Sequence, residues 1–98
     1  MIVRALYQPD QKKFLADAYA GSFHLEDREN PDLREFIYFC PCGCGHKGRL
    51  LVGDGLKPAG ARPSWYWNGS TSEPILEPSV NHEGHWHGWL RNGYWEPS

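Results

Sequence analysis

The sequence has no long hydrophobic run, no excess of positive charge and few cysteines. No apolar segment of its 98 residues approaches the roughly 20 residues that a membrane-spanning helix requires, so we expect no membrane partner. The formal net charge of −2 and the lack of a lysine or arginine stripe argue against nucleic-acid binding. No signal peptide opens the chain, and its three cysteines are an odd number. These features predict a cytoplasmic protein with reduced thiols.

Glycine, proline and aromatic residues are abundant instead. There are 11 Gly, 8 Pro, five Trp, five Tyr and four Phe, and short apolar segments alternate with turn signals. This pattern is typical of a β-rich protein. The length suits one domain, and a structural metal would add usefully to its stability. We therefore expect a mainly β fold built of hairpins, with residues 1–98 forming a single domain.

Local patterns predict where the elements lie. At most one short helix is expected near the N-terminus, over residues 11–19, where Phe14, Leu15 and Ala18 share one side. Asn92-Gly93 between apolar segments predicts a hairpin. The acidic segment 26–32 reads as a solvated loop, and the Gly/Pro-rich segment 53–63 as an irregular one. Strands are expected at residues 2–7, 34–40, 47–53, 65–67, 75–76, 86–90 and 94–95.

Three cysteines in five residues are the strongest chemical signal. Cys40, Cys42 and Cys44 can converge on one ion because the intervening Pro41 and Gly43 let the chain curl. Thiolate and imidazole are the ligands that Zn²⁺ favours, and the second candidate cluster is His85 and His87. These two histidines would share one face of a strand. The sequence therefore predicts a Zn²⁺ site formed by the β-hairpin tip and this histidine pair, so that residues 1–98 would be a single zinc-binding domain built around a zinc knuckle.

The ligand set is left open between two arrangements. Three thiolates with His87, or two thiolates with both His85 and His87, would each complete a tetrahedral site. His46 and His82 lie near the clusters in sequence and are read as bystanders. Thiolate-rich sites are generally structural, so a closed site is favoured over a catalytic one. The alternative is that the cysteines are small buried hydrophobic residues without a metal.

The order of three motifs resembles one family of small proteins. The motifs are Phe39-Cys-Pro-Cys-Gly-Cys-Gly45, Glu77-Pro-Ser-Val80 and the histidine- and tryptophan-rich segment 85–95. They are similar to those of the DUF6527 family of bacteria and phages over roughly residues 36–95. The resemblance implies a β-rich metal-binding domain, and relatives that lie beside bacterial ubiquitin-like conjugation genes imply a proteolytic deconjugation role for some members.

Two functional interpretations follow. The favoured one is a non-enzymatic, zinc-stabilised β domain of phage or bacterial origin that binds another protein, because tryptophan and tyrosine make good interface anchors. The alternative is a small hydrolase or peptidase acting on a protein or ubiquitin-like conjugate. That activity would use the metal, or Ser79 as nucleophile with His87 or His82 as base. A serine after Pro78 is more often a turn cap, and His87 cannot serve both as a zinc ligand and as a base.

Overall fold

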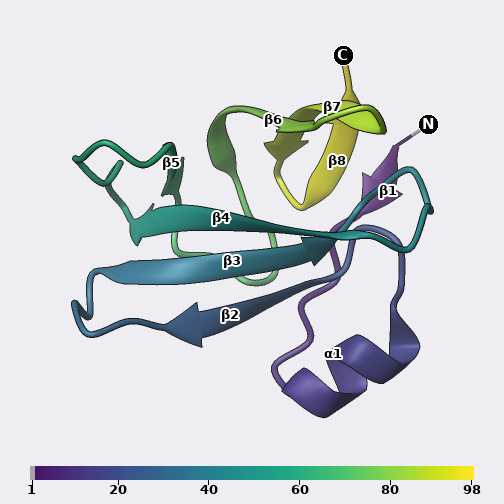
Figure 1. The fold of residues 1–98 in the computed structure, drawn as a ribbon, viewed down its shortest axis with the longest axis horizontal. Coiled ribbons are helices and arrows are strands. Elements are labelled where there is room, and N and C mark those ends of the chain that lie inside the picture. Colours follow the sequence, from purple (N-terminus) through teal and green to yellow (C-terminus); the bar gives the residue numbers. More distant parts are fainter. Residues whose placement is uncertain (1) are drawn as a thin grey trace.

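A computed structural model describes residues 2–98, whose strands form one curled sheet (Figure 1). The described residues contain eight strands in the order β1-β8-β7-β6-β5-β4-β3-β2. Neighbouring strands are antiparallel except for the parallel pair β4 and β5. The strands are β1 (Val3–Arg4), β2 (Phe23–Asp27), β3 (Leu33–Phe39), β4 (Lys47–Asp54), β5 (Ser64–Trp67), β6 (Leu76–His82), β7 (Trp86–Arg91) and β8 (Tyr94–Pro97).

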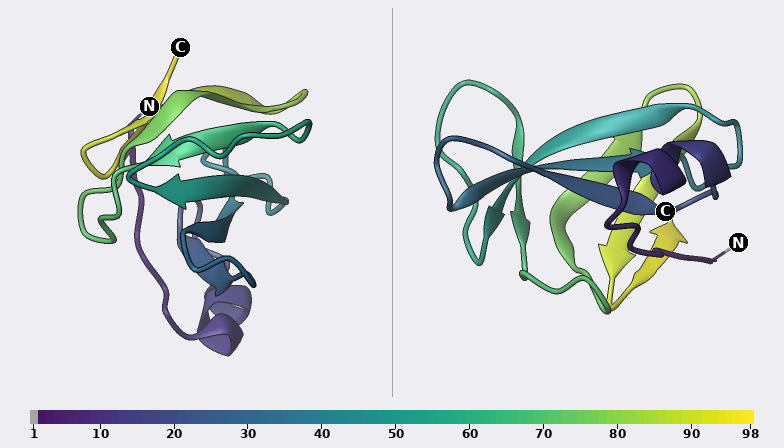
Figure 2. Two further views of the ribbon diagram at one scale, coloured as in Figure 1. Left: turned by 90° about the vertical axis from the view of Figure 1, so that its left-hand side faces the viewer. Right: turned by 90° about the horizontal axis from the view of Figure 1, so that it is seen from below.

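The two ends of the sheet meet through the chain that follows β1. Tyr7 forms a parallel bridge with Phe23 at the start of β2. The backbone N–H of Gln8 donates to the Phe23 carbonyl at 2.8 Å, and the Phe23 N–H donates to the Leu6 carbonyl at 2.9 Å. These bonds draw the edge strands together, so that the sheet wraps around its own core (Figure 2).

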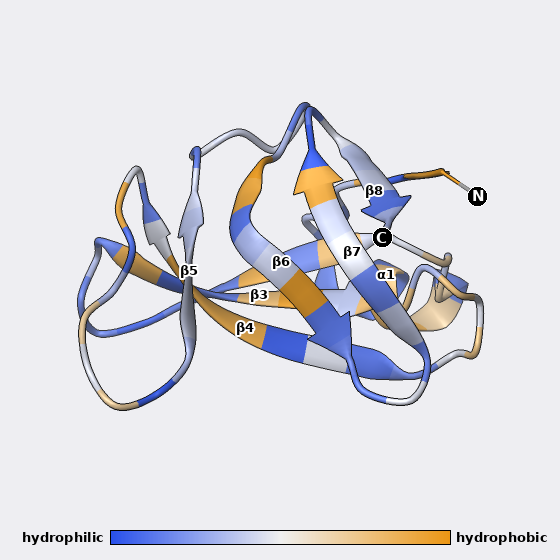
Figure 3. Cartoon of the chain, turned by 90° about the horizontal axis from the view of Figure 1, so that it is seen from above, coloured by the Kyte–Doolittle hydropathy of each residue, from blue (hydrophilic) through white to orange (hydrophobic). Residues whose placement is uncertain are grey.

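The core fills the inside of the curl with alternate side chains from each strand. Strands β6 and β7 each carry a few hydrophobic positions among hydrophilic ones (Figure 3), and Leu76, Val80 and Leu90 are the buried hydrophobic residues on them. Trp95 is fully buried at the centre, and its indole N–H donates to the Gly21 carbonyl at 2.8 Å. The buried core side chains are Ala5, Phe23, Phe36, Tyr38, Leu50, Val52, Trp67, Leu76, Val80, Leu90 and Trp95.

A single short helix among the described residues, α1 (Gln11–Asp17), lies against β2 (Figure 1). Asp10 caps it by accepting from the backbone N–H groups of Lys12 at 2.9 Å and Lys13 at 3.3 Å. Phe14 is buried in a second, smaller cluster with Ile37 and Phe39. The helix therefore covers one end of the sheet, away from β6 and β7.

The mainly β fold with one short N-terminal helix is confirmed, but several expected bounds differ. The helix ends at Asp17 because Ala18 takes the left-handed conformation, with φ of 48°. The first strand covers only Val3–Arg4, and β2 was not expected at all, since its Glu26 and Asp27 made the segment resemble a loop. Strand β6 continues to His82 through Pro78, well beyond the two residues expected.

Candidate functional site

The tip of the β3–β4 hairpin carries the three cysteines. The backbone N–H of Cys40 donates to the His46 carbonyl at 2.8 Å, and the Gly43 N–H donates to the Cys40 carbonyl at 3.1 Å. Gly43 and Gly45 both have positive φ, which permits the tight curl that their position predicts. The turn therefore brings Cys44 and His46 to the outer end of the hairpin.

A second hairpin tip, between β6 and β7, faces the first. His82 and Trp86 pair across the hairpin, and the backbone N–H of His85 donates to the His82 carbonyl at 2.9 Å. Gly84 supplies the positive φ of 80° that this turn needs. His82 and His85 consequently project from the two ends of one tight turn.

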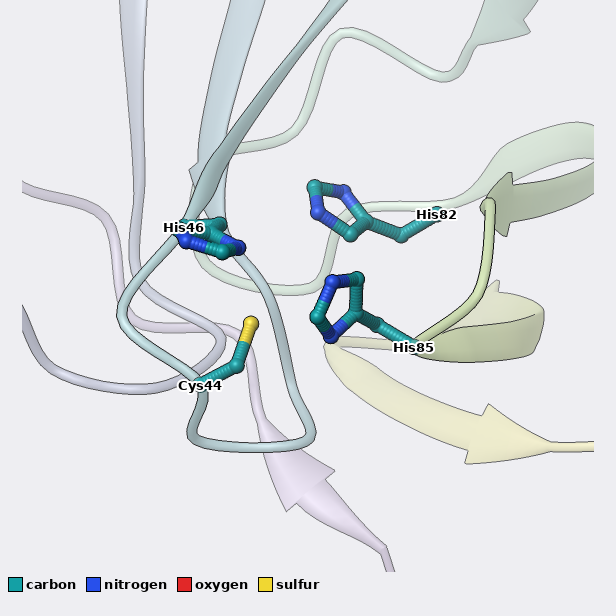
Figure 4. A group of neighbouring side chains, drawn as sticks. All are labelled: Cys44, His46, His82 and His85. Carbon is teal, nitrogen blue, oxygen red and sulfur yellow. The ribbon is translucent and has the colours of Figure 1, made fainter.

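Two groups of side chains could hold a metal ion. In each group the potential ligand atoms lie within 4.8 Å of one another. One group combines both hairpin tips (Figure 4), and the other lies within the cysteine turn. The first group is Cys44, His46, His82 and His85, and the second is Cys40, Cys42 and Cys44.

Burial and mutual contacts shift the protonation of these groups. Burial raises the pKa of the Cys40 thiol to about 12. A hydrogen bond from the Cys40 thiol, whose sulfur lies 3.2 Å from that of Cys42, lowers the pKa of Cys42. Burial, followed by the neighbouring His85 and His46, lowers the pKa of His82. Each of these effects favours the neutral form of His82, which is the form that binds metals.

The outer face of strands β6 to β8 carries a separate chain of polar side chains. The Nε2 atom of His87 lies 3.1 Å from Ser79 Oγ, and its Nδ1 atom lies 3.1 Å from Ser98 Oγ. Both ring nitrogens are therefore within hydrogen-bond distance of a serine hydroxyl. Ser79 is half-buried and His87 is exposed, so this chain of contacts is open to a large molecule.

Sheet register explains why these three residues meet. His87 on β7 pairs with Asn81 on β6, and Ser79 lies two residues before Asn81 on the same face. On the other side, Gly88 pairs with Pro97 of β8, and the Ser98 N–H donates to the His87 carbonyl at 2.9 Å. The sheet therefore aligns the three side chains across adjacent strands. The ladder between β6 and β7 shifts register between Leu76 and Val80, where Ser79 lies.

A cleft of about 660 Å³ adjoins Ser79. Much of its wall is apolar or aromatic, with Trp89 on one side and Tyr66 on another. Arg91 stacks over the Trp89 ring at 4.6 Å, and Lys57 comes from the loop between β4 and β5. The remaining lining residues are Ile75, Leu76, Glu77 and Pro78.

The predicted site residues thus fall into two places. Cys40, Cys42 and Cys44 lie together, and His85 joins Cys44. His87 lies with Ser79 and, within residues 2–98, belongs to neither metal-type group.

His46 and His82, read as bystanders from the sequence, contribute to the four-residue group, and Ser98 was not considered. For His46 and His82, the only available sequence signal was that they lie close to the two clusters. No sequence signal identified Ser98.

A serine hydroxyl within hydrogen-bond distance of an imidazole is the pairing that serine hydrolases use, although the second ring nitrogen here faces the Ser98 hydroxyl and not the carboxylate of the usual triad. Comparison with known families agrees with that class. The model of the BubE family, described as the serine protease of a bacterial ubiquitination-like system, matches residues 9–98, and the chain belongs to this family. No curated protein and no solved structure matches the chain.

The family match corrects the resemblance drawn from the motifs. It assigns the chain to BubE and not to DUF6527, and it extends into the N-terminal third that the resemblance left uncovered. It supports the hydrolase alternative better than the binding module favoured from the sequence. In the described part of the chain, no helix is both long enough and apolar enough to cross a membrane.

Proposed function

We propose that this protein is a serine protease that releases a ubiquitin-like protein from its conjugates or precursors, with Ser79 as nucleophile and His87 as base. The observation that carries the proposal is the 3.1 Å separation between Ser79 Oγ and His87 Nε2. The description of the family as a ubiquitination-like system's serine protease supports the substrate class. The protein partner is thus the substrate.

The chemistry follows from the protonation of His87. Neutral Nε2 accepts the Ser79 proton while Oγ attacks the scissile carbonyl carbon. The imidazolium then donates that proton to the leaving group, and the acyl group stays on Ser79. Water, deprotonated by Nε2, breaks the acyl ester and restores the free serine.

Ser98 is placed to favour the tautomer that this role needs. When the His87 Nδ1–H donates to Ser98 Oγ, at the observed 3.1 Å, Nε2 is left without a proton and can act as a base. Ser98 is neutral, so it orients the ring but gives the imidazolium less stabilisation than a carboxylate would. We therefore assign Ser98 a positioning role.

The cleft beside Ser79 suits an extended peptide tail. Its apolar wall can hold alternate side chains of such a segment, while Lys57 and Arg91 provide positive charge for an acidic group or a backbone carbonyl. A tail that reaches the nucleophile from a folded protein would also cover the exposed His87. Substrate binding itself would then exclude water from the reacting groups.

The cysteine and histidine groups take no part in the proposed chemistry. Their donors are those of Zn²⁺, and we assign the ion a structural role, because a serine nucleophile with its own base needs no metal-bound water. This separation also removes the conflict over His87, which can act as the base without binding the ion.

The test is cleavage of a fusion in which the ubiquitin-like protein of the same system precedes a fluorescent protein. Wild type should cut at the junction, and Ser79→Ala should lower kcat by at least about 1,000-fold with the fold and metal content unchanged. Ser72→Ala, which removes an exposed hydroxyl 3.3 Å from Ser70 Oγ, is the matched control and should cut normally. Equal cleavage by wild type and Ser79→Ala would exclude Ser79 as the nucleophile.

A further inference from the structure

Four potential ligands from two hairpin tips converge on one point. Cys44 and His46 come from the β3–β4 tip, and His82 and His85 come from the β6–β7 tip (Figure 4). A tetrahedral Zn²⁺ with bonds of 2.0–2.3 Å separates its ligand atoms by about 3.3–3.8 Å. Since these atoms already lie within 4.8 Å of one another, small side-chain rotations close the site.

We infer that Cys44, His46, His82 and His85 bind one Zn²⁺ ion that joins the two hairpin tips and holds the β6–β7 hairpin in place. This set differs from both arrangements that the sequence suggested, because it uses one thiolate and excludes His87. Its donors are one sulfur and three imidazole nitrogens, which suit Zn²⁺ and not Ca²⁺ or Mg²⁺.

The second group, Cys40, Cys42 and Cys44, fits the ion less well. It offers three donors from a single turn, so a fourth ligand would have to come from elsewhere to close the coordination sphere. Cys40 is fully buried, as expected of a small hydrophobic side chain. An ion held by this group alone would also leave the three converging imidazoles unexplained.

The hydroxyl of a buried tyrosine lies within hydrogen-bond distance of His82. Tyr38 Oη lies 3.3 Å from His82 Nδ1, so Nε2 is the nitrogen left to face the ion. Tyr38 comes from β3 and is 2% exposed, which fixes its hydroxyl firmly. Histidine ligands characteristically have such a hydrogen-bond partner on their second nitrogen.

The ion would position the proposed catalytic pair. Ser79 lies three residues before His82, and His87 lies two residues after His85, so the ion would tie both ends of the β6–β7 turn to the β3–β4 tip within three residues of the reacting groups. The β6–β7 register shift at Ser79 leaves that segment with less ladder support, which the ion supplements. This step, unlike the binding of the ion, rests on the proposed function.

The first experiment measures metal content and coordination in the full chain. Purified wild type should hold about one Zn²⁺ per chain. Replacement by Co²⁺ should give the visible spectrum of a tetrahedral site with one thiolate ligand. Cys44→Ser and His82→Ala should lose the ion, while Cys42→Ser and His87→Ala should keep it. Loss of the ion in Cys42→Ser, its loss in His87→Ala, or wild type without bound metal would each overturn the ligand set.

A second measurement guards against variants that fail to fold. Tyr38→Phe keeps the buried ring but removes the hydroxyl beside His82, and should weaken Zn²⁺ affinity by about 10- to 100-fold. Unchanged affinity would contradict the assignment of Nε2.

Chelation and reloading of wild type test positioning. Removing the ion should lower kcat for the fusion more than it raises KM, and Zn²⁺ should restore it. A wild-type protein that binds the metal but cleaves no fusion would contradict the proposed function and leave the metal site unaffected. Full activity after chelation would contradict only the positioning role of the ion.

Discussion

At the scale of single residues, His87 shows how one side chain can be assigned two incompatible roles from sequence. Its position two residues after His85 suggested a shared face and a shared ion. In the structure His85 lies in the turn before β7, so the two rings do not follow strand alternation. His87 instead contacts Ser79 and Ser98 through its two nitrogens. The contacts of both nitrogens, and not the residue's spacing, favour the role of base.

Replacing Ser98 with alanine tests the orientation of His87. Loss of one neutral hydrogen bond costs about 1–1.5 kcal/mol, so kcat for the fusion should fall by about tenfold with KM little changed. Ser72→Ala is again the control. A purely structural role for Ser98 would lower the melting temperature without separating kcat from KM, and a variant with wild-type kcat would show that Nδ1 needs no such partner.

At the scale of elements, the Gly/Pro-rich segment between β4 and β5 is tied to the sheet by a buried carboxylate. Glu35 on β3 is 5% exposed and accepts two hydrogen bonds from Arg62, at 2.8 and 2.9 Å. Arg28 also contacts it, and Arg49 lies 3.7 Å away. The hydrogen bond from Arg62, followed by other contacts with Arg62 and Arg28, lowers the pKa of Glu35 from its usual 4.5 despite the opposing effect of burial.

Glu35→Gln should therefore destabilise the fold in a pH-dependent way. Because the folded-state pKa is lowered, the stabilisation by Glu35 is complete above about pH 4.5 and is lost as the pH falls through the folded-state value. We expect a loss of about 1–2 kcal/mol at pH 7, reduced by the partial exposure of the arginines, and a smaller difference from wild type in acid. Urea unfolding at several pH values measures it.

Glu26→Gln is the control, since the Glu26–Arg49 pair is more exposed and should contribute about 0.5 kcal/mol or less. A constant difference between Glu35→Gln and wild type from pH 7 to acid would contradict the linkage.

Some elements could be predicted from local sequence and others could not. The β7–β8 hairpin follows from Asn92-Gly93, whose φ values of 49° and 86° form the expected turn. The cysteine turn follows from its glycines. Strand β2 could not be predicted, because its outward Glu26 and Asp27 resemble loop residues until pairing with β3 is known. The strand expected at residues 75–76 is too short, because Pro78 reads as its end in the sequence. In the structure Pro78 lies within β6, where the β6–β7 ladder shifts register.

At the scale of the whole molecule, the candidate sites exist only because the sheet brings distant segments together. Ser79, His87 and Ser98 lie on or beside three neighbouring strands, and the two hairpin tips are separated by β5 and the long loop before it. The residue types were visible in the sequence, and so were the cysteine and histidine clusters. Their grouping depended on register and on the curl of the sheet, which short-range patterns do not specify.

The most direct test of the central claim is covalent labelling of the intact protein with a fluorophosphonate probe. The account predicts that wild type gains one probe per chain at Ser79, located by peptide mass spectrometry, because only a serine beside a base reacts readily. Ser79→Ala and His87→Ala should remain unlabelled, and Ser72→Ala should label like wild type. An unrelated serine hydrolase in the same tube serves as the positive control for labelling. The account would be contradicted if that control is labelled and wild type is not, or if wild type is modified at another serine.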